Sequence, residues 1–258
     1  MNELFAILHE DAELLVVSKP AGLVCHPTKP DGRSSLISRV RAYLGVGVTP
    51  RLVNRLDRET SGVVLVAKTA AVASELGKFF AGRAVEKEYL AIVHGHLRED
   101  HGLIDAPLGK DEGSTVAIKD CVRPDGAPAQ TKFSVLQRFS RSEGDFSLLR
   151  VRPLTGRKHQ IRIHLSHTGH PIVGDKIYGG DERLYLDFVT GRMTDEQRRQ
   201  LLLPNHALHA AEIRFTWRGR GLRLQAAAED WFTAFIGCRA PCSNPIGSPS
   251  LPDLRGGR

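Results

Sequence analysis

Continuous apolar runs and alternating apolar and polar positions dominate the chain, and they predict strands wherever Gly, Pro or charged residues bound them. The expected strands cover 13–18, 62–68, 88–93, 131–139, 146–151, 208–215 and 222–226. Apolar residues at helical spacing predict helices over 35–44, 70–80 and 230–236. Thr194 and Gln197 form a capping-box pattern, which predicts a further helix through Leu203.

The order of these elements favours one fold class. Strands and helices mix irregularly, and the neighbouring runs 131–139 and 146–151 are typical of a hairpin. We therefore expect an α+β protein with a mixed, mostly antiparallel sheet rather than a doubly wound parallel sheet. The end of the chain is rich in Pro, Gly and Ser, so we expect one folded domain over 1–238 and a flexible tail over 239–258.

Composition excludes several classes of protein. Of 258 residues, 41% are hydrophobic and 25% are charged, which excludes wholesale disorder. The acidic start is unlike a signal peptide and no apolar run approaches about eighteen residues, so we expect neither export by that route nor a membrane partner. The cysteines are Cys25, Cys121, Cys238 and Cys242. Their spacing suits reduced thiols in a cytoplasmic protein, and the last pair lacks the second ligand pair of a zinc site.

The charge balance points to a polyanionic partner. The formal net charge is +7, and the basic residues gather in 138–167 and again in 192–223. Many of them are arginines, whose guanidinium groups pair bidentately with phosphate oxygens. Charge alone leaves two readings open, a solvated basic face or a surface that binds nucleic acid.

Asp57 is the first candidate for chemistry. It lies in the segment RLDRETSG (55–62), directly ahead of a buried strand and between Arg55 and Arg58. Nearby cations favour the charged form of a carboxyl group, so Asp57 can stay ionised close to the protein interior. The same residue types also build ordinary polar turns, so a purely structural role stays open.

A second candidate segment is LTGRKHQIRIHL (154–165). A helix that begins near Gly156 would place His159 and Arg162 on one face, and its N-terminus would suit a phosphate. The nearby histidines lack accompanying Cys or carboxylate ligands, so we expect no metal site. Tyr89 begins a predicted strand, where it can serve as core or as a stacking platform for a base.

Taken together, these segments resemble the RluA-type family of RNA pseudouridine synthases. The matching segments, in the family's order, are LLVVSKPAGLVCHP (14–27), RLDRETSG (55–62), EKEYLAIVHG (86–95), RPDGAPAQTKF (123–133), RPLTGRKHQIRIHLSHTGHPIVGDKIYG (152–179) and LHA (208–210). The resemblance implies an isomerase that converts uridine in rRNA or tRNA to pseudouridine. This reaction has no redox change and no net group transfer, so we expect no cofactor or metal. We also expect a cytoplasmic protein that acts as a monomer. The resemblance further implies that the domain over 1–238 is a catalytic domain of pseudouridine synthase type.

The resemblance also assigns residues. It implies that Asp57 is the essential aspartate, that Tyr89 packs on the target uracil and that Arg162 pairs with the catalytic carboxylate. The residues expected to contact RNA are Asn54, Arg55, Arg157, His159 and Gln160. An alternative is a non-catalytic module that binds or folds RNA on the same scaffold, although such a module has no need of the catalytic set. A metal-dependent nuclease is disfavoured, because the chain lacks clustered acidic ligands.

The chain departs from the family pattern in two places. Asn54 stands where many members have His, which affects substrate contacts more than the aspartate itself. The first motif begins at Leu14, so we expect no N-terminal RNA-binding domain of the S4 type. Target recognition is then expected to involve an insertion over 180–206, which precedes LHA.

Overall fold

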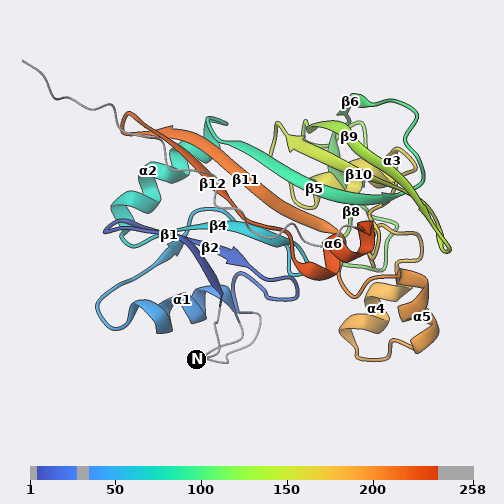
Figure 1. The fold of residues 1–258 in the computed structure, drawn as a ribbon, viewed down its shortest axis with the longest axis horizontal. Coiled ribbons are helices and arrows are strands. Elements are labelled where there is room, and N and C mark those ends of the chain that lie inside the picture. Colours follow the sequence, from blue (N-terminus) through green and yellow to red (C-terminus); the bar gives the residue numbers. More distant parts are fainter. Residues whose placement is uncertain (1–4, 28–34, 238–258) are drawn as a thin grey trace, which may run out of the picture.

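A ten-stranded sheet runs the length of the molecule (Figure 1). The computed structural model describes residues 5–27 and 35–237. The strands are β1 (Ala6–Glu10), β2 (Leu14–Lys19), β3 (Arg51–Leu52), β4 (Ser61–Ala67), β5 (Glu86–His94), β6 (His101–Asp105), β7 (Leu108–Lys110), β8 (Asp120–Val122), β9 (Gln130–Arg141), β10 (Gly144–Pro153), β11 (Leu208–Trp217) and β12 (Arg220–Gln225). The main order is β1-β2-β4-β11-β5-β10-β9-β6, with β12 beside β11, β3 beside β4, and β7–β8 as a separate pair.

The sheet is mostly antiparallel. Among the paired strands of the described chain, only β4 and β11 run parallel. The fold class expected from the sequence is therefore confirmed, and so is the hairpin of β9 and β10. The shorter strands β1, β3, β6, β7 and β8 were not predicted, because their brief runs carry too few alternating positions.

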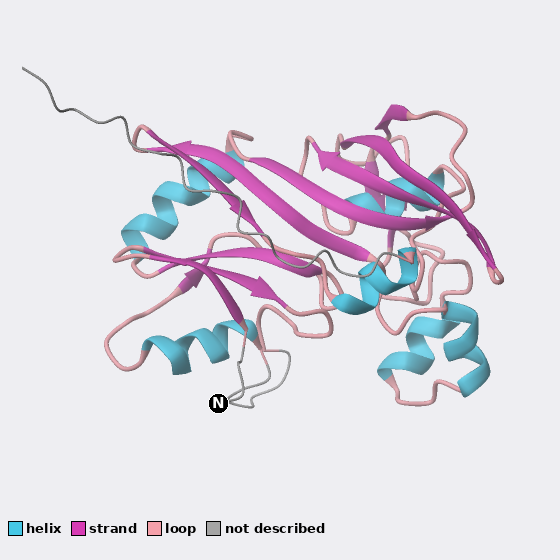
Figure 2. Cartoon of the chain, in the orientation of Figure 1, coloured by secondary structure: helices cyan, strands magenta, loops and turns pink. Residues whose placement is uncertain are grey.

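Helices lie around the sheet rather than within it (Figure 2). They are α1 (Leu36–Leu44), α2 (Ala70–Ala81), α3 (Gln160–His167), α4 (Arg183–Val189), α5 (Asp195–Leu201) and α6 (Asp230–Ile236). Ser35, Thr69 and Thr194 cap the N-termini of α1, α2 and α5, each by accepting a backbone N–H bond. The capping box of Thr194 and Gln197 is present as predicted.

Two predicted helix boundaries were wrong. The helix expected near Gly156 begins at Gln160, because His159 adopts a left-handed backbone with φ of 54° and the Gln160 side chain caps the preceding turn. The helix expected through Leu203 ends at Leu201, since Leu202 has φ of 64°. The segment 180–206, which the sequence analysis expects to be an insertion, contains α4 as well as α5. The predicted tail, with Cys238 and Cys242, lies outside the described residues.

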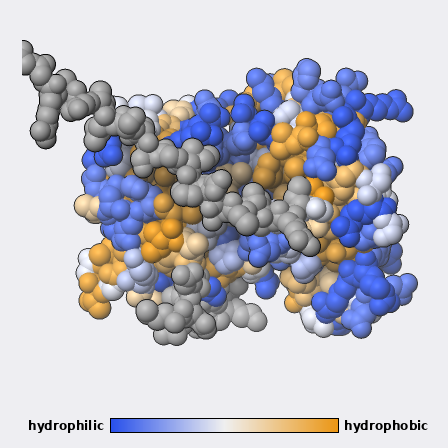
Figure 3. Space-filling model, in the orientation of Figure 1, coloured by the Kyte–Doolittle hydropathy of each residue, from blue (hydrophilic) through white to orange (hydrophobic). Residues whose placement is uncertain are grey.

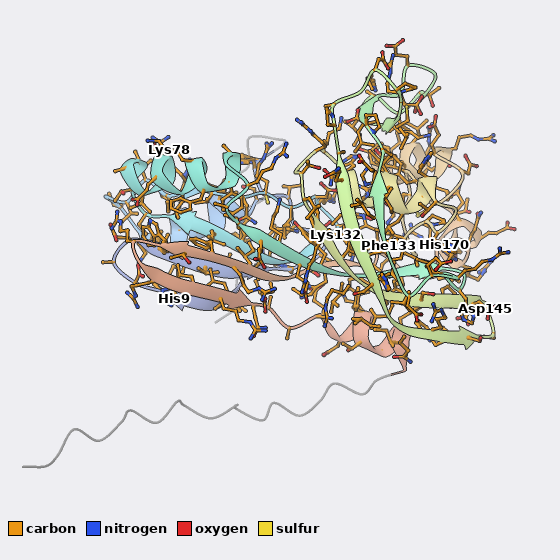
Figure 4. The ribbon with its side chains drawn as sticks, turned by 90° about the horizontal axis from the view of Figure 1, so that it is seen from above. His9, Lys78, Lys132, Phe133, Asp145 and His170 are labelled. Carbon is orange, nitrogen blue, oxygen red and sulfur yellow. The ribbon has the colours of Figure 1, made fainter. Side chains whose placement is uncertain are left out.

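Alternate residues of β2 and β4 bury against opposite helices. Leu14 and Val16 of β2 belong to the cluster that α2 covers, while Leu15 and Val17 belong to the cluster that α1 covers. Burial on both faces explains why these strands are continuously apolar rather than alternating. Seen from above, the half of the molecule that contains β2 and β4 carries Lys78 and His9, and the other half carries Lys132, Phe133 and Asp145 (Figure 4). The other half has its own core around β5, β10, α3 and α6.

The parallel contact of β4 and β11 joins the segments TSG and LHA. Gly62 pairs with Ala210 and has φ of +114°. A Cβ atom at this position would lie 2.2 Å from the Ala210 carbonyl oxygen, so only glycine fits. The close approach fixes the end of the 55–62 turn against β11, and this turn carries Asp57.

Candidate active site

A cleft of about 660 Å³ opens between the two halves. The 54–60 turn forms one wall, 153–162 forms the opposite wall, and Tyr89 of β5 lies between them. Among the described residues that line the cleft, Asp57 is the only carboxylate. The lining cations are Arg55, Arg58, Arg83, Lys87, Arg157, Lys158 and Arg162. The cleft is thus a basic groove with a single negative side chain.

Buried polar contacts hold the turn around Asp57 in place. Lys19 is fully buried and donates hydrogen bonds to the carbonyls of Pro20, Leu23 and Arg58, the last at 3.0 Å. Burial lowers the pKa of Lys19 to about 8. The Thr60 hydroxyl and His206 Nε2 share a hydrogen bond of 2.7 Å on the inner side of the turn. The position of the carboxylate therefore depends on residues far away in sequence.

Arg162 links two carboxylates. Its Nε and Nη2 donate to Asp175 at 2.6 and 2.8 Å, and its Nη1 donates to Asp57 Oδ2 at 2.9 Å. Asp175 is completely buried and accepts further bonds from the backbone N–H groups of Ile177 and Tyr178. The Asp57 side chain, in contrast, is 31% exposed and open to the cleft. Asp175 thus holds the guanidinium group in place, so that Nη1 of Arg162 points at the accessible carboxylate of Asp57.

This arrangement keeps Asp57 ionised. Burial opposes ionisation, but the Arg162 guanidinium outweighs it and holds the pKa of Asp57 below its usual value. Burial likewise opposes charge on Asp175, whose pKa the same guanidinium nevertheless holds far below the ordinary range. Burial disfavours the charge on Arg162 as well, yet the two carboxylates raise its pKa. All three groups are charged at neutral pH.

His159 faces Asp57 as a neutral ring. Burial and the Arg162 charge lower the pKa of His159 to about 4. His159 Nδ1 and the Tyr178 hydroxyl share a hydrogen bond of 2.9 Å. In the tautomer in which the hydroxyl donates to Nδ1, the ring hydrogen is on Nε2, which lies 3.8 Å from Asp57 Oδ2. In this tautomer, His159 presents a hydrogen-bond donor beside the accessible carboxylate.

Tyr89 combines a packed ring with access to the cleft. The ring contacts the hydrophobic clusters of both halves, and burial, with Asp57 nearby, raises the pKa of its hydroxyl. The phenol is neutral at pH 7. Within the described part of the chain, this hydroxyl makes no hydrogen bond. An aromatic face held rigidly beside a carboxylate is suited to stack on a planar ring.

The remaining residues predicted to contact RNA fall into two groups in the structure. Arg55 and Arg157 are exposed in the cleft. Asn54 and Gln160 also line it, but their amides are engaged elsewhere. Asn54 bonds the β4 backbone at Val63 and Leu65. Gln160 bonds two backbone groups and two threonine hydroxyls across the wall. Their contact with substrate stays a prediction, whereas their role in building the walls is visible.

Sequence reasoning missed four residues that build the site: Lys19, Asp175, Tyr178 and His206. Three of them lie in segments already singled out, Lys19 in LLVVSKPAG and the others in GDKIYG. A charged or polar residue inside an otherwise apolar segment was the available signal. Their long-range partners could not be inferred, because those contacts join residues 13 to 146 positions apart in the chain.

Many of the clustered bases are not free for phosphate. Arg150 and Arg152 both pair with Glu88, while Arg214 and Arg223 both pair with Glu212. The bases of 138–167 that line the cleft are those of the 157–162 segment. The described residues contain no group of three or more side chains suited to hold a metal ion. No helix in the described ranges is long and apolar enough to span a membrane.

The fold and the cleft define a class of protein, and comparison with known families agrees. The model of the RNA pseudouridylate synthase family matches residues 13–167, and the chain belongs to this family. The matched range contains Asp57, Tyr89 and Arg162 and ends within the last turn of α3. Asp175 lies beyond it.

Similarity to individual relatives and solved structures extends over most of the chain. "Ribosomal large subunit pseudouridine synthase C" of Vibrio parahaemolyticus is 37% identical over 81% of this chain and 60% of its own length. "Dual-specificity RNA pseudouridine synthase RluA" of Yersinia pestis is 40% identical over 68% of this chain and 82% of its own length. The solved structure of "Human RNA Pseudouridylate Synthase Domain Containing 1" superposes with a TM-score of 0.69 at 28% identity, covering 89% of this chain and 86% of that one. The chain thus spans about 60% of the length of several curated relatives.

Proposed function

We propose that this protein isomerises uridine in RNA to pseudouridine and that Asp57 carries the chemistry. One observation supports this most strongly: a single ionised carboxylate, paired with a fixed guanidinium group, lies in a basic cleft beside an aromatic ring. Binding of a nucleic-acid backbone needs positive charge, and stacking of a base needs an aromatic ring. A surface that only binds RNA has no need of the carboxylate.

The reaction requires little more than these groups. The bond between C1′ and N1 of the uridine breaks, the uracil turns, and a bond between C1′ and C5 forms. The proton displaced from C5 leaves to solvent while N1 gains one, so no electron or group is transferred overall. An ionised Asp57 can attack C1′ as a nucleophile, or it can remove the C2′ proton to give a glycal intermediate. Both routes use the charge that Arg162 stabilises.

The target base must leave its stack before Asp57 can reach the sugar. Turning a nucleotide out costs a few kcal/mol, which contacts inside the cleft must offset. Tyr89 supplies a rigid face for the uracil, and His159 Nε2–H supplies a donor next to the reacting sugar. Arg55 and Arg157 are exposed where they can bind the flanking phosphates.

Ribosomal RNA is the first substrate to test, because relatives named as large-subunit synthases align with most of this chain; transfer RNA is the second. We propose that the protein acts as a monomer. Cys25 and Cys121 are free thiols, which suits the cytoplasm that we propose as the location. No cofactor or metal is needed for the isomerisation.

Replacement of Asp57 by Asn tests the assignment. The RNA is total RNA from cells that lack the protein, incubated with purified wild type or variant, and pseudouridines are mapped by sequencing. We expect the wild type to restore specific sites, Asp57→Asn to restore none, and RNA affinity to be nearly unchanged. Asp181→Asn, an exposed aspartate that also pairs with an arginine, is the matched control and should retain activity.

Two outcomes would contradict the proposal. Pseudouridine formation by Asp57→Asn would refute the role of Asp57. An RNA-binding wild type that modifies no RNA would instead support the non-catalytic binding module. Denaturation curves of the variants show whether a lost activity reflects a lost fold.

A further inference from the structure

A second, smaller cavity lies directly beside the catalytic cleft. Its volume is about 150 Å³, and we call it the α4 pocket because Tyr185, Phe188 and Val189 of α4 form its outer wall. It shares four lining residues with the main cleft: Asp57, Arg58, His159 and Arg162. A chain-like ligand with one unit in the main cleft therefore passes the mouth of the α4 pocket at a neighbouring unit.

The outer wall of the α4 pocket is apolar although it faces solvent. Val189 is 51% exposed, and Ile118 on the opposite rim is 41% exposed. The neighbouring surface over α4 and α5 is largely hydrophilic (Figure 3, lower right). Val189 and Ile118 thus place exposed aliphatic side chains at the mouth of a cavity that adjoins the main cleft.

Cations flank the aromatic ring at the centre of this wall. The Arg58 guanidinium carbon lies 5.3 Å and Lys176 Nζ lies 4.8 Å from the centroid of the Phe188 ring. Lys176 also pairs with the buried Glu59 at 2.8 Å, so it is held in place. Arg58 is exposed, and its Nε donates to the Gly22 carbonyl at 3.2 Å, which leaves its terminal N–H groups for a phosphate beside the ring. An aromatic face with an adjacent exposed cation is suited to a nucleotide, which joins a flat base to a charged phosphate.

The α4 pocket is built before any ligand arrives. Glu182, at the N-terminal end of α4, accepts hydrogen bonds from the Ser114 and Thr115 hydroxyls and from Lys119 Nζ. These contacts attach α4 to the loop between β7 and β8, which carries Ile118. Because both rims are already joined, binding need not order them, and the entropic cost of binding is reduced.

The size of the cavity limits its occupant. A cavity of about 150 Å³ holds a single benzene-sized ring. We propose that the α4 pocket binds the base of a nucleotide that adjoins the target uridine, and that it favours the single ring of a pyrimidine over the two rings of a purine. This inference rests on the proposed function, since it requires RNA in the main cleft. It gives the insertion over 180–206 a specific task in the choice of sequence.

The test uses an RNA site that the wild type modifies, with both flanking nucleotides randomised. Sequencing of the modified fraction gives the preference at each flanking position for wild type, Phe188→Leu and Val189→Glu. Phe188→Leu keeps an apolar side chain but removes the aromatic face, and Val189→Glu places a negative charge at the mouth. Val46→Glu, on a fully exposed valine outside both cavities, is the matched control.

We expect the wild type and Val46→Glu to favour pyrimidines at one flanking position. Loss of a base-stacking contact weakens binding by about tenfold, so both pocket variants should lose most of this preference while still modifying the uridine. An unchanged preference in both pocket variants would overturn the proposal. Equal loss of activity on every flanking sequence would also overturn it, since the pocket would then hold the target uracil. A wild type that modifies no RNA refutes the proposed function instead, and this inference with it.

Discussion

Replacement of Asp175 by Asn separates the positioning of Arg162 from the chemistry of Asp57. Asp175 is fully buried, the Arg162 side chain is 6% exposed, and two hydrogen bonds of 2.6 and 2.8 Å join them. Asparagine keeps the size and one acceptor oxygen, but its amide presents N–H groups to a guanidinium group that can only donate. One of the two bonds is lost, and Arg162 is left partly unpaired in the interior.

The expected loss of stability is large. Breaking a buried ion pair by removing one partner costs about 3–5 kcal/mol. For a chain of this size, each kcal/mol shifts the melting temperature by about 2–4 °C, so the variant should melt about 6–20 °C below the wild type. Asp181→Asn is the control, since Asp181 is 46% exposed and its partner Arg183 is 82% exposed. An exposed pair of this kind should shift the free energy of unfolding by less than about 1 kcal/mol.

The pH dependence of this difference follows from the sign of the pKa shift. Arg162 holds the pKa of Asp175 below its value in the unfolded chain, so the stabilisation is present above the unfolded pKa of about 4. It is lost as the pH falls through the folded-state pKa. The stability difference between wild type and Asp175→Asn should therefore be constant between about pH 6 and 8 and should shrink only below about pH 4.

Catalysis should suffer beyond the loss of stability. A guanidinium group released from Asp175 can shift by about 1 Å, and a misplacement of that size costs about a hundredfold in rate. The measurements are urea denaturation at several pH values and single-turnover pseudouridine formation well below the melting temperature. A variant that loses less than about 1 kcal/mol and keeps wild-type turnover would show that Asp175 does not position Arg162.

Three further predictions concern charge in the cleft. Arg162→Ala removes the cation that lowers the pKa of Asp57, so the remaining pseudouridine formation should rise with pH as Asp57 ionises; a flat profile of rate against pH would contradict this. His159 is neutral above about pH 4, so the wild-type rate should show no step near pH 6.5; a step that disappears in His159→Gln would refute its assignment as a neutral donor. RNA affinity should fall with salt by about 0.7 log units per log unit of salt for each phosphate contact, and Arg157→Glu should reduce that slope in filter-binding titrations; a slope near zero in the wild type would refute the basic-cleft argument.

Local pattern was enough for the elements with strong periodicity. The continuously apolar runs of β2 and β4 and the capping box of Thr194 and Gln197 depend on residues close together in the chain, so the sequence predicts them directly. The resemblance placed Asp57, Tyr89 and Arg162 together in one site, and the structure brings them to the same cleft. The boundary of α3 was missed because it depends on a left-handed His159, which no periodic pattern reports.

Only the tertiary structure decided how the site is held and charged. Asp57 and Arg162 are 105 positions apart, and Asp175, the carboxylate that fixes Arg162, follows Arg162 by 13 positions, beyond the end of α3. Charge alone left the role of the clustered arginines open, and the structure pairs those of β10, β11 and β12 with glutamates on their own or neighbouring strands. The spacing of residues in the sequence indicates which side chains can share the buried face of an element and which can cap a helix. Which charges meet depends on how strands far apart in the chain pack, and the α4 pocket exists only because α4 and the β7–β8 loop meet there.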